Sequence, residues 1–211
     1  CESTQAAGTI EHGLGVAPEF MRVKHRTATE SAIIYHHKNT TAPETDYLTF
    51  SSNATGDASA FWNDTAPTSS IFTVGNTGSG NESNKTYVFY MWKEIQGYSK
   101  FGSYTGNGNA DGAFVYTGFK PSCVLIKRYA GGTGNWWLWD NKREGYNVDN
   151  DPLYANANVA EGTADNLDIL SNGFKMLRTD GGENASGATY IYMAFAEQPF
   201  VNSNGAPANA R

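Results

Sequence analysis

The chain repeats itself at a spacing of 103 residues. Pro18 and Pro121 each follow a glycine by three positions and precede a run of alternating apolar residues that ends in basic ones. Residues 81–94 and 184–197 align at the same spacing, and each segment carries an asparagine, a Thr-Tyr pair and an apolar run. An internal repeat of this length constrains the fold strongly, because both copies must bury their apolar faces in the same way.

The repeat divides the chain into two predicted domains, residues 1–103 and 104–211, each of a common domain size. The first opens without a counterpart of residues 104–111, so we interpret its start as truncated. Residues 97–104 carry aromatic rings three positions apart, and we expect them to pack as a rigid connector. Cys1 fits two interpretations, a fragment of a longer polypeptide or a lipoprotein cut before an acylated cysteine.

Short β-branched and aromatic runs separated by Gly- and Asn-rich turns predict an all-β fold. The predicted strands are residues 20–24, 33–36, 47–50, 71–74 and 87–92 in the first unit, and 123–127, 136–139, 173–176 and 190–195 in the second. Many short strands with glycine-rich turns are typical of sandwiches. We therefore expect two tandem antiparallel β-sandwiches of jelly-roll type. Cys123, on an apolar strand position, is expected to be a buried thiol.

Composition excludes several classes of function. Charged residues make up 17% of the 211 residues, well below the typical value of about 25%. The net charge is −6 and basic residues form no cluster, so we expect no nucleic-acid partner. No apolar run approaches the roughly 20 residues that cross a bilayer, so we expect no membrane insertion. Low charge with many small polar residues is typical of extracellular and virion β-proteins.

The tryptophan-rich strand offers a candidate ligand-binding surface formed by Trp137 and Trp139, with His36 at the matching place in the first unit. At a spacing of 103 residues Trp139 aligns with the polar ring of His36, so we expect Trp139 to be partly exposed. Trp136 and Leu138 are expected to face the core. A simpler interpretation is that these large rings fill space between units or subunits.

Asn107, Asn109 and Asp111 alternate like the ligands of a calcium loop. An EF-hand would place a glutamate at its twelfth position, which is Gly118 here, and a helix on each side. A turn built by Asn and Gly is the simpler interpretation, and calcium is the only cofactor we consider. Neither zinc-ligand spacing nor a G-x-S-x-G motif occurs, so we expect no enzyme.

Six N-x-[ST] sequences occur, beginning at Asn39, Asn53, Asn63, Asn81, Asn84 and Asn184. Such sequences are glycosylation acceptors in secreted eukaryotic proteins. Asn81 and Asn184 stand 103 residues apart in the repeat. For this pair we predict a structural role in a turn.

Residues 98–121 resemble the signature of an uncharacterised domain family that occurs in virion proteins of tailed bacteriophages, many of them marine. Residues 10–18, 61–65 and 190–205 also resemble this family. The resemblance implies a structural virion protein, with a tail fibre or receptor-binding role favoured. It carries no catalytic residues over to this chain.

We therefore expect the distal part of a phage tail fibre or receptor-binding protein on the virion exterior, with residues 207–211 as a natural C-terminus. Its expected partners are further copies in a homotrimer, other virion proteins, and a host cell-surface glycan or protein. The main alternative is a capsid decoration or head-fibre protein with a purely structural role. An envelope lipoprotein and a depolymerase are weaker alternatives.

Overall fold

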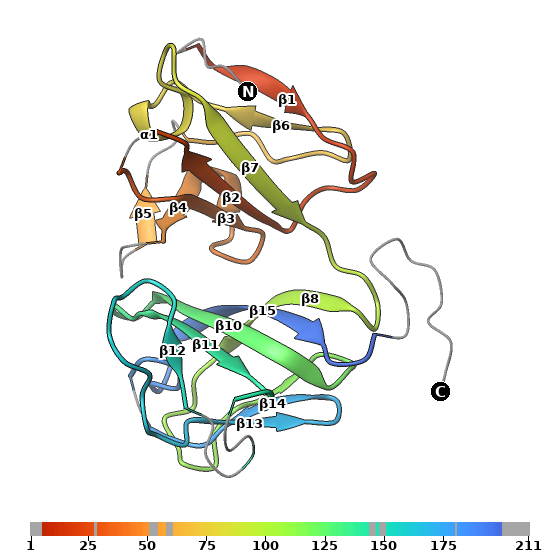
Figure 1. Ribbon diagram of the computed structural model, residues 1–211, viewed down its shortest axis with the longest axis vertical. Helices are drawn as coiled ribbons and strands as arrows, with labels where there is room; N and C mark the ends of the chain where they lie inside the picture. Colours follow the sequence, from red (N-terminus) through yellow and green to blue (C-terminus); the bar gives the residue numbers. More distant parts are fainter. Residues whose placement is uncertain are drawn as a thin grey trace. The chain divides into compact units, whose positions relative to one another are not determined.

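The computed structural model describes residues 6–27, 29–50, 55–57, 61–143, 147, 151–179 and 181–199 (Figure 1). Cys1, Asn53 and residues 207–211 lie outside this part, and so do the interpretations that depend on them. The chain divides into two compact units, Cys1–Lys93 and Glu94–Arg211, which we describe separately. Helix in the described residues is confined to single turns, and none of it is long and apolar enough to cross a membrane.

The first unit contains a five-stranded antiparallel sheet in the order β5-β4-β3-β2-β7 and a two-stranded sheet, β1-β6. The strands are β1 (Gly8–Glu11), β2 (Phe20–His25), β3 (Ile33–His36), β4 (Asp46–Thr49), β5 (Thr55–Asp57), β6 (Ile71–Val74) and β7 (Tyr87–Trp92). A 3-10 turn (Pro43–Thr45) precedes β4, and one helical turn, α1 (Gly78–Asn81), follows β6.

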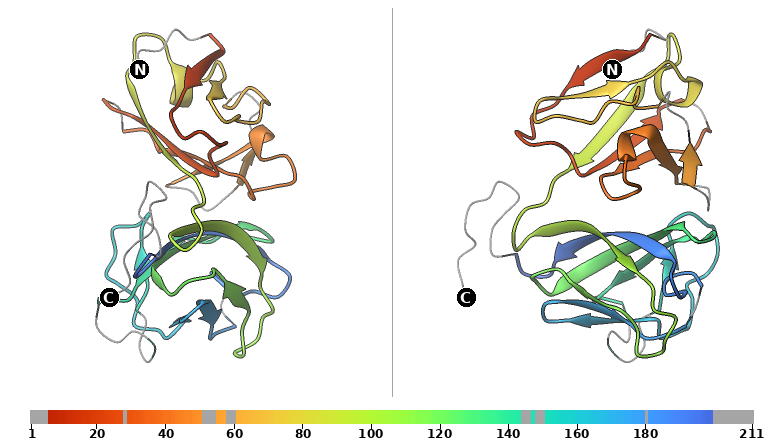
Figure 2. Two further views of the ribbon diagram at one scale, coloured as in Figure 1. Left: turned by 90° about the vertical axis from the view of Figure 1, so that its right-hand side faces the viewer. Right: turned by 180° about the vertical axis from the view of Figure 1, so that it is seen from behind.

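The second unit contains a five-stranded sheet in the order β12-β11-β10-β15-β8 and a three-stranded sheet, β13-β14-β9. Its strands are β8 (Ser99–Thr105), β9 (Phe114–Tyr116), β10 (Pro121–Ala130), β11 (Trp136–Asp140), β12 (Leu153–Tyr154), β13 (Leu167–Leu170), β14 (Gly173–Met176) and β15 (Thr189–Ala196). Figure 2 shows the two sheets of this unit as separate layers. The predicted all-β class is confirmed.

Each unit has its own apolar core, built from both of its sheets. In the first unit Met21 and Tyr35 of the larger sheet pack with Phe72 of the smaller one. In the second, Trp139 and Tyr190 pack with Phe174. This arrangement is compatible with the expected sandwiches, and the matching strand orders β4-β3-β2-β7 and β12-β11-β10-β15 are compatible with an internal duplication.

The boundary between the units differs from the predicted one. Residues 97–104 were expected to connect the units, yet β8 pairs along its whole length with β15, from Ser99 opposite Phe195 to Thr105 opposite Thr189. Backbone hydrogen bonds therefore place this segment within the second unit, and the chain divides after Lys93.

The two copies differ by one residue between their first two long strands. In the first unit Val23 pairs with Ile33, and in the second unit Ile126 pairs with Trp137. Ile126 lies 103 residues after Val23, but Trp137 lies 104 residues after Ile33. The connection is thus one residue longer in the second unit. Trp139 therefore corresponds to Tyr35, and not to His36 as the constant spacing predicted. A shift of one residue in a strand moves every side chain to the opposite face of the sheet.

Lys24 and Lys127 hold this connection in the same way in both copies. The Lys24 ammonium donates to the carbonyl of Glu30, and the Lys127 ammonium donates to the carbonyl of Gly134 at 2.6 Å. Lys127 is fully buried, and burial lowers its pKa to about 8. The extra residue therefore lies between Lys127 and Gly134.

A buried asparagine fixes the start of the first unit. Asn81 has 6% of its surface exposed, and its amide donates to the carbonyls of Ala6 at 2.7 Å and Gly75 at 3.2 Å. These bonds tie the opening segment of the unit to the end of β6.

The same bonds recur in the second unit. Asn184 is fully buried and donates to the carbonyls of Asn109 at 2.9 Å and Arg178 at 2.7 Å, each 103 residues after its counterpart. The predicted structural role of Asn81 and Asn184 in turns is confirmed.

Candidate functional site

The residues predicted to form a ligand surface lie in the interior. Trp139 is fully buried, Trp137 is 8% exposed, and His36 is 1% exposed. The two indoles stack on one another, with ring centroids 5.8 Å apart and planes 9° apart, and both belong to the core of the second unit. The expectation of a partly exposed Trp139 is therefore wrong, because the longer connection turns this strand by one residue. A stacking platform needs an open ring face, so these three residues do not form one.

The predicted calcium loop has the hydrogen bonds of a turn. The side-chain oxygen of Asn107 accepts from the Asn109 backbone at 3.0 Å, and that of Asn109 accepts from the Asp111 backbone at 3.1 Å. The Asp111 carboxylate binds the Lys175 ammonium, and this hydrogen bond lowers the pKa of Asp111. In the part of the chain that can be described, no three His, Cys, Asp or Glu residues gather as metal ligands. The turn interpretation accounts for these residues, and calcium stays a prediction that we do not take further.

Two exposed aromatic residues stand side by side on the three-stranded sheet of the second unit. Phe114 is 49% exposed and Tyr116 is 62% exposed, while Val115 between them points into the core. Alternate residues of a strand point to opposite faces, so both rings lie on the outer face of β9. We call Phe114, Tyr116 and their outer-face neighbours on β13 and β14 the aromatic face.

Gly173 forms the floor of the aromatic face and is buried, with the Phe114 ring 3.2 Å from where a Cβ would stand. Gly173 pairs with Tyr116 on one side and with Leu170 on the other. A Cβ at this position would lie 2.1 Å from the carbonyl oxygen of Val115, so only glycine fits. The Phe114 ring therefore covers the backbone between Tyr116 and Leu170.

Charged groups border the rings. Lys175 pairs with Phe114 in β9 and with Asp168 in β13, so its stem shares the outer face with both. The Lys175 ammonium also binds the Asp111 carboxylate. The aromatic face thus combines two exposed apolar rings with adjacent hydrogen-bond donors and acceptors.

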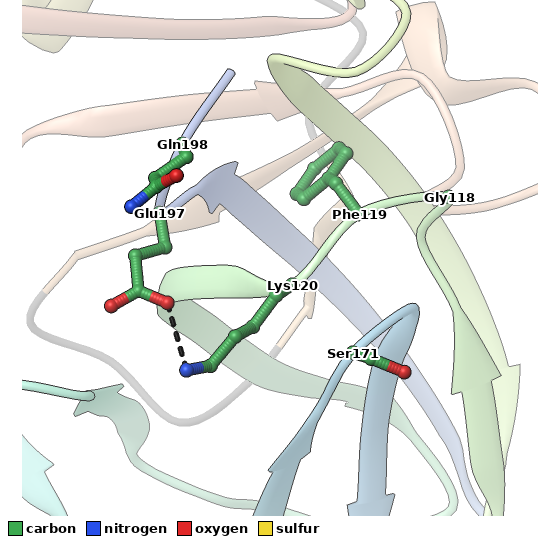
Figure 3. Close-up of a pocket in the computed structure, with 6 residues that line it drawn as sticks. All are labelled: Gly118, Phe119, Lys120, Ser171, Glu197 and Gln198. Carbon is green, nitrogen blue, oxygen red and sulfur yellow. Dashed lines mark ion pairs between the residues drawn. The ribbon is translucent and has the colours of Figure 1, made fainter. Parts of the chain in front are cut away.

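A pocket of about 330 Å³ opens beyond the end of β9, lined by Gly118, Phe119, Lys120, Ser171, Glu197 and Gln198 (Figure 3). The Lys120 ammonium lies 2.8 Å from one Glu197 oxygen, and the Lys142 ammonium lies 3.1 Å from the other. The hydrogen bond from Lys120 lowers the pKa of Glu197, and Lys142 adds to this effect. Of the two ammonium groups that bind Glu197, that of Lys120 lines the pocket, so the pocket holds one ion pair.

The pocket adjoins the aromatic face. A Cβ placed on Gly118, which lines the pocket, would lie 3.6 Å from the Tyr116 hydroxyl. Ser171, which also lines the pocket, belongs to the turn between β13 and β14, and both strands contribute to the aromatic face. The two features therefore form one continuous surface of the second unit.

The first unit lacks this surface. Ile10 pairs with Phe72 in the first unit in the way that Val115 pairs with Phe174 in the second. The neighbours of Ile10, Thr9 and Glu11, therefore occupy the positions that Phe114 and Tyr116 occupy in the second unit. The aromatic face is thus a difference between two otherwise corresponding units. The sequence contained this signal, but a strand of three residues is too short for alternation to reveal it.

The profile of a domain family described as "Domain of unknown function (DUF7483)" matches residues 2–199 in a single match that takes in both units. Searches of curated proteins and of solved structures found no significant match. The chain belongs to the DUF7483 family.

Proposed function

We propose that this protein is a non-enzymatic virion component of a tailed bacteriophage, in the distal part of a tail fibre or receptor-binding protein, and that its second unit binds a host-surface glycan through the aromatic face. The phage assignment is supported by the sequence resemblance of residues 98–121. The glycan assignment is supported by the structure of the aromatic face itself.

The observation that carries the proposal is the pair of exposed rings, Phe114 and Tyr116, on the outer face of β9. Exposed aromatic residues that stand together mark binding surfaces more often than single ones do. A pyranose ring has an apolar face of C–H groups, which packs against Phe114 and Tyr116. Its hydroxyls then reach Lys175 and Asp168, which supply a donor and an acceptor.

The pocket extends the binding surface beyond one sugar. The Lys120 ammonium lines the pocket, where it can donate to an acidic substituent such as a uronic acid carboxylate as it donates to Glu197. Acidic sugars are common chemistry in bacterial capsules, so the pocket fits the proposed class of ligand. Assembly as a homotrimer with other virion proteins belongs to the same proposal.

A glycan array of bacterial capsular and lipopolysaccharide fragments tests this function with the full chain. We expect binding that Phe114→Ala and Tyr116→Ala each weaken by about five- to thirtyfold, as truncation of an aromatic anchor typically does. Tyr90→Ala is the matched control, because Tyr90 is an exposed aromatic residue of the first unit, 47% accessible.

Binding that survives the Phe114 and Tyr116 substitutions would refute the assignment to the aromatic face. Failure to bind any envelope glycan, together with location of the protein on the head by electron microscopy, would favour the capsid decoration alternative.

A further inference from the structure

Five of the six N-x-[ST] sequences begin at described residues, and the fold separates them by exposure. Three of their asparagines are buried: Asn39 is 1% exposed, Asn81 is 6% exposed and Asn184 is fully buried. A sugar joined to a buried amide has no room unless the fold opens. Asn63 and Asn84 are exposed, so they are the two positions where a sugar fits the folded protein.

Asn84 stands at the tip of a tight turn. The Lys85 amide donates to the Glu82 carbonyl at 3.2 Å, and Asn84 has a φ of 60°, in the left-handed region. Its counterpart in the second unit, 103 residues later, is Gly187 with a φ of 74°. The turn therefore requires this backbone conformation but does not require the amide of Asn84.

The second unit also shows that a side chain at this position meets open space. A Cβ placed on Gly187 would have no atom of the described residues within 4 Å. In this unit β8 is present beside β15, and the Gly187 amide donates to the Gly106 carbonyl just beyond β8 at 2.9 Å. The room for a side chain therefore persists when a strand covers the neighbouring sheet edge.

The two exposed sequences differ in the hydroxyl that completes each of them. The Thr65 hydroxyl donates to the Asn63 carbonyl at 2.7 Å, and the Thr65 amide donates to the Trp62 carbonyl at 3.2 Å. The Thr86 hydroxyl, two residues after Asn84, makes no hydrogen bond within the described part of the chain. A transferase that selects N-x-[ST] sequences can thus reach the hydroxyl of Thr86 without breaking a bond.

We propose that Asn84 is a glycosylation site, which accepts a hexose from a nucleoside-diphosphate sugar in a reaction catalysed by a separate transferase. The amide nitrogen of Asn84 attacks the anomeric carbon of the hexose. A C–N bond forms while the C–O bond to the nucleoside diphosphate breaks. The nitrogen gives up one proton and the nucleoside diphosphate leaves, with no oxidation or reduction. The proposal is independent of glycan binding at the aromatic face, because Asn84 belongs to the first unit.

A soluble N-glycosyltransferase specific for N-x-[ST] sequences, supplied with UDP-glucose, tests the proposal on the folded full chain. We expect intact mass spectrometry to show one added hexose and peptide mapping to place it on Asn84. Asn63 should react about five- to tenfold more slowly, because the hydrogen bond of the Thr65 hydroxyl must break first. Asn39, Asn81 and Asn184 should stay unmodified.

Five peptides, each carrying one of these sequences, are the matched control. Each peptide should accept the hexose, because no fold surrounds its asparagine. Differences between sites that appear only in the folded chain then come from the structure.

Variants of the full chain provide the second arm. Asn84→Gly should abolish the modification and leave the melting temperature unchanged, because the second unit has glycine at this turn. Thr86→Val should also abolish the modification, whereas Thr86→Ser keeps the hydroxyl and should retain it. If Thr86→Val does not fold, Asn84→Gly and the peptides still decide.

Absence of hexose from Asn84 in the folded chain would overturn the proposal, and so would failure of the Asn84 peptide to react. Faster modification of Asn63 than of Asn84, or hexose on a buried asparagine of the folded chain, would contradict the selection by exposure. A melting temperature lowered by the hexose would contradict the open space around Asn84.

Discussion

Replacing Asn184 by alanine tests the claim that one buried amide holds the opening loop of the second unit. Asn184 donates to the carbonyls of Asn109 and Arg178 and to the side-chain oxygen of Asn107, and it accepts from the Asn107 backbone at 3.0 Å. At about 1 kcal/mol of net stability for each hydrogen bond, the four together contribute about 4 kcal/mol. Because Asn184 is fully buried, carbonyls left without a donor raise the expected loss toward about 5 kcal/mol.

The repeat provides a matched comparison. Asn81→Ala removes two donated bonds, so we expect a loss of about 2 kcal/mol confined to the first unit. Asn158→Ala, at an exposed position, should change stability by less than about 0.5 kcal/mol. Native-state amide exchange in urea separates the units, because β15 reports the second unit and β7 the first.

A loss below about 0.5 kcal/mol for Asn184→Ala would refute the hydrogen-bond account, since the exposed Asn158 is expected to cost as much. An equal loss of protection in β7 and β15 would show that the units do not unfold separately. Asn184→Asp adds a check by pH. A buried aspartate has a raised pKa, so this variant should be more stable at pH 4 than at pH 7.

Three further outcomes are expected. Trp139→Ala should cost about 3–5 kcal/mol in urea unfolding and leave glycan affinity of the folded protein unchanged, because the indole is fully buried. Burial lowers the pKa of Lys127 to about 8, whereas the same lysine in the unfolded chain has a pKa of about 10.5. Between pH 8 and 10 the unfolded chain therefore binds more protons, so the free energy of unfolding should rise with pH, by at most about 3 kcal/mol. Lys127→Met should remove this rise in urea titrations. Gly173→Val should displace β9 and lower the melting temperature measured by circular dichroism, because its Cβ would collide with the Val115 carbonyl.

The strands and their repeat could be predicted because buried strands require apolar side chains, so runs of apolar residues mark them in the sequence. Residues 87–92 and 190–195 lie in corresponding strands, each paired with the strand that follows Pro18 or Pro121. The matching asparagines were also recognisable, since each is followed five residues later by a Thr-Tyr pair.

The orientation of the tryptophan strand could not be predicted in the same way. One extra residue between Lys127 and Gly134 reverses its faces, and the connections share too little sequence to locate an insertion. A constant spacing of 103 residues aligns Trp139 with His36 and therefore predicts that Trp139 faces away from the core. The pairing of Ile126 with Trp137 and the hydrogen bond from Lys127 to Gly134 reveal the change.

The aromatic face escaped prediction for a different reason. β9 has three residues, and its exposed Phe114 and Tyr116 resemble any apolar strand until Val115 is seen to point inward. If the two units are aligned so that Ile10 matches Val115, Thr9 and Glu11 of the first unit match Phe114 and Tyr116 of the second. The sequence does not supply this alignment, because it follows from the pairing of Ile10 and Val115 with phenylalanines of the core.

Chemical-shift mapping with a bound glycan tests the central claim most directly. The full chain, labelled with ¹⁵N, is titrated with the glycan that binds best on the array, and amide shifts are followed in both units. We predict saturable shifts at Phe114, Tyr116 and Lys175, with the strands of the first unit unaffected. Shifts confined to the first unit, or no saturable shift on β9 and β14, would contradict a glycan site on the aromatic face.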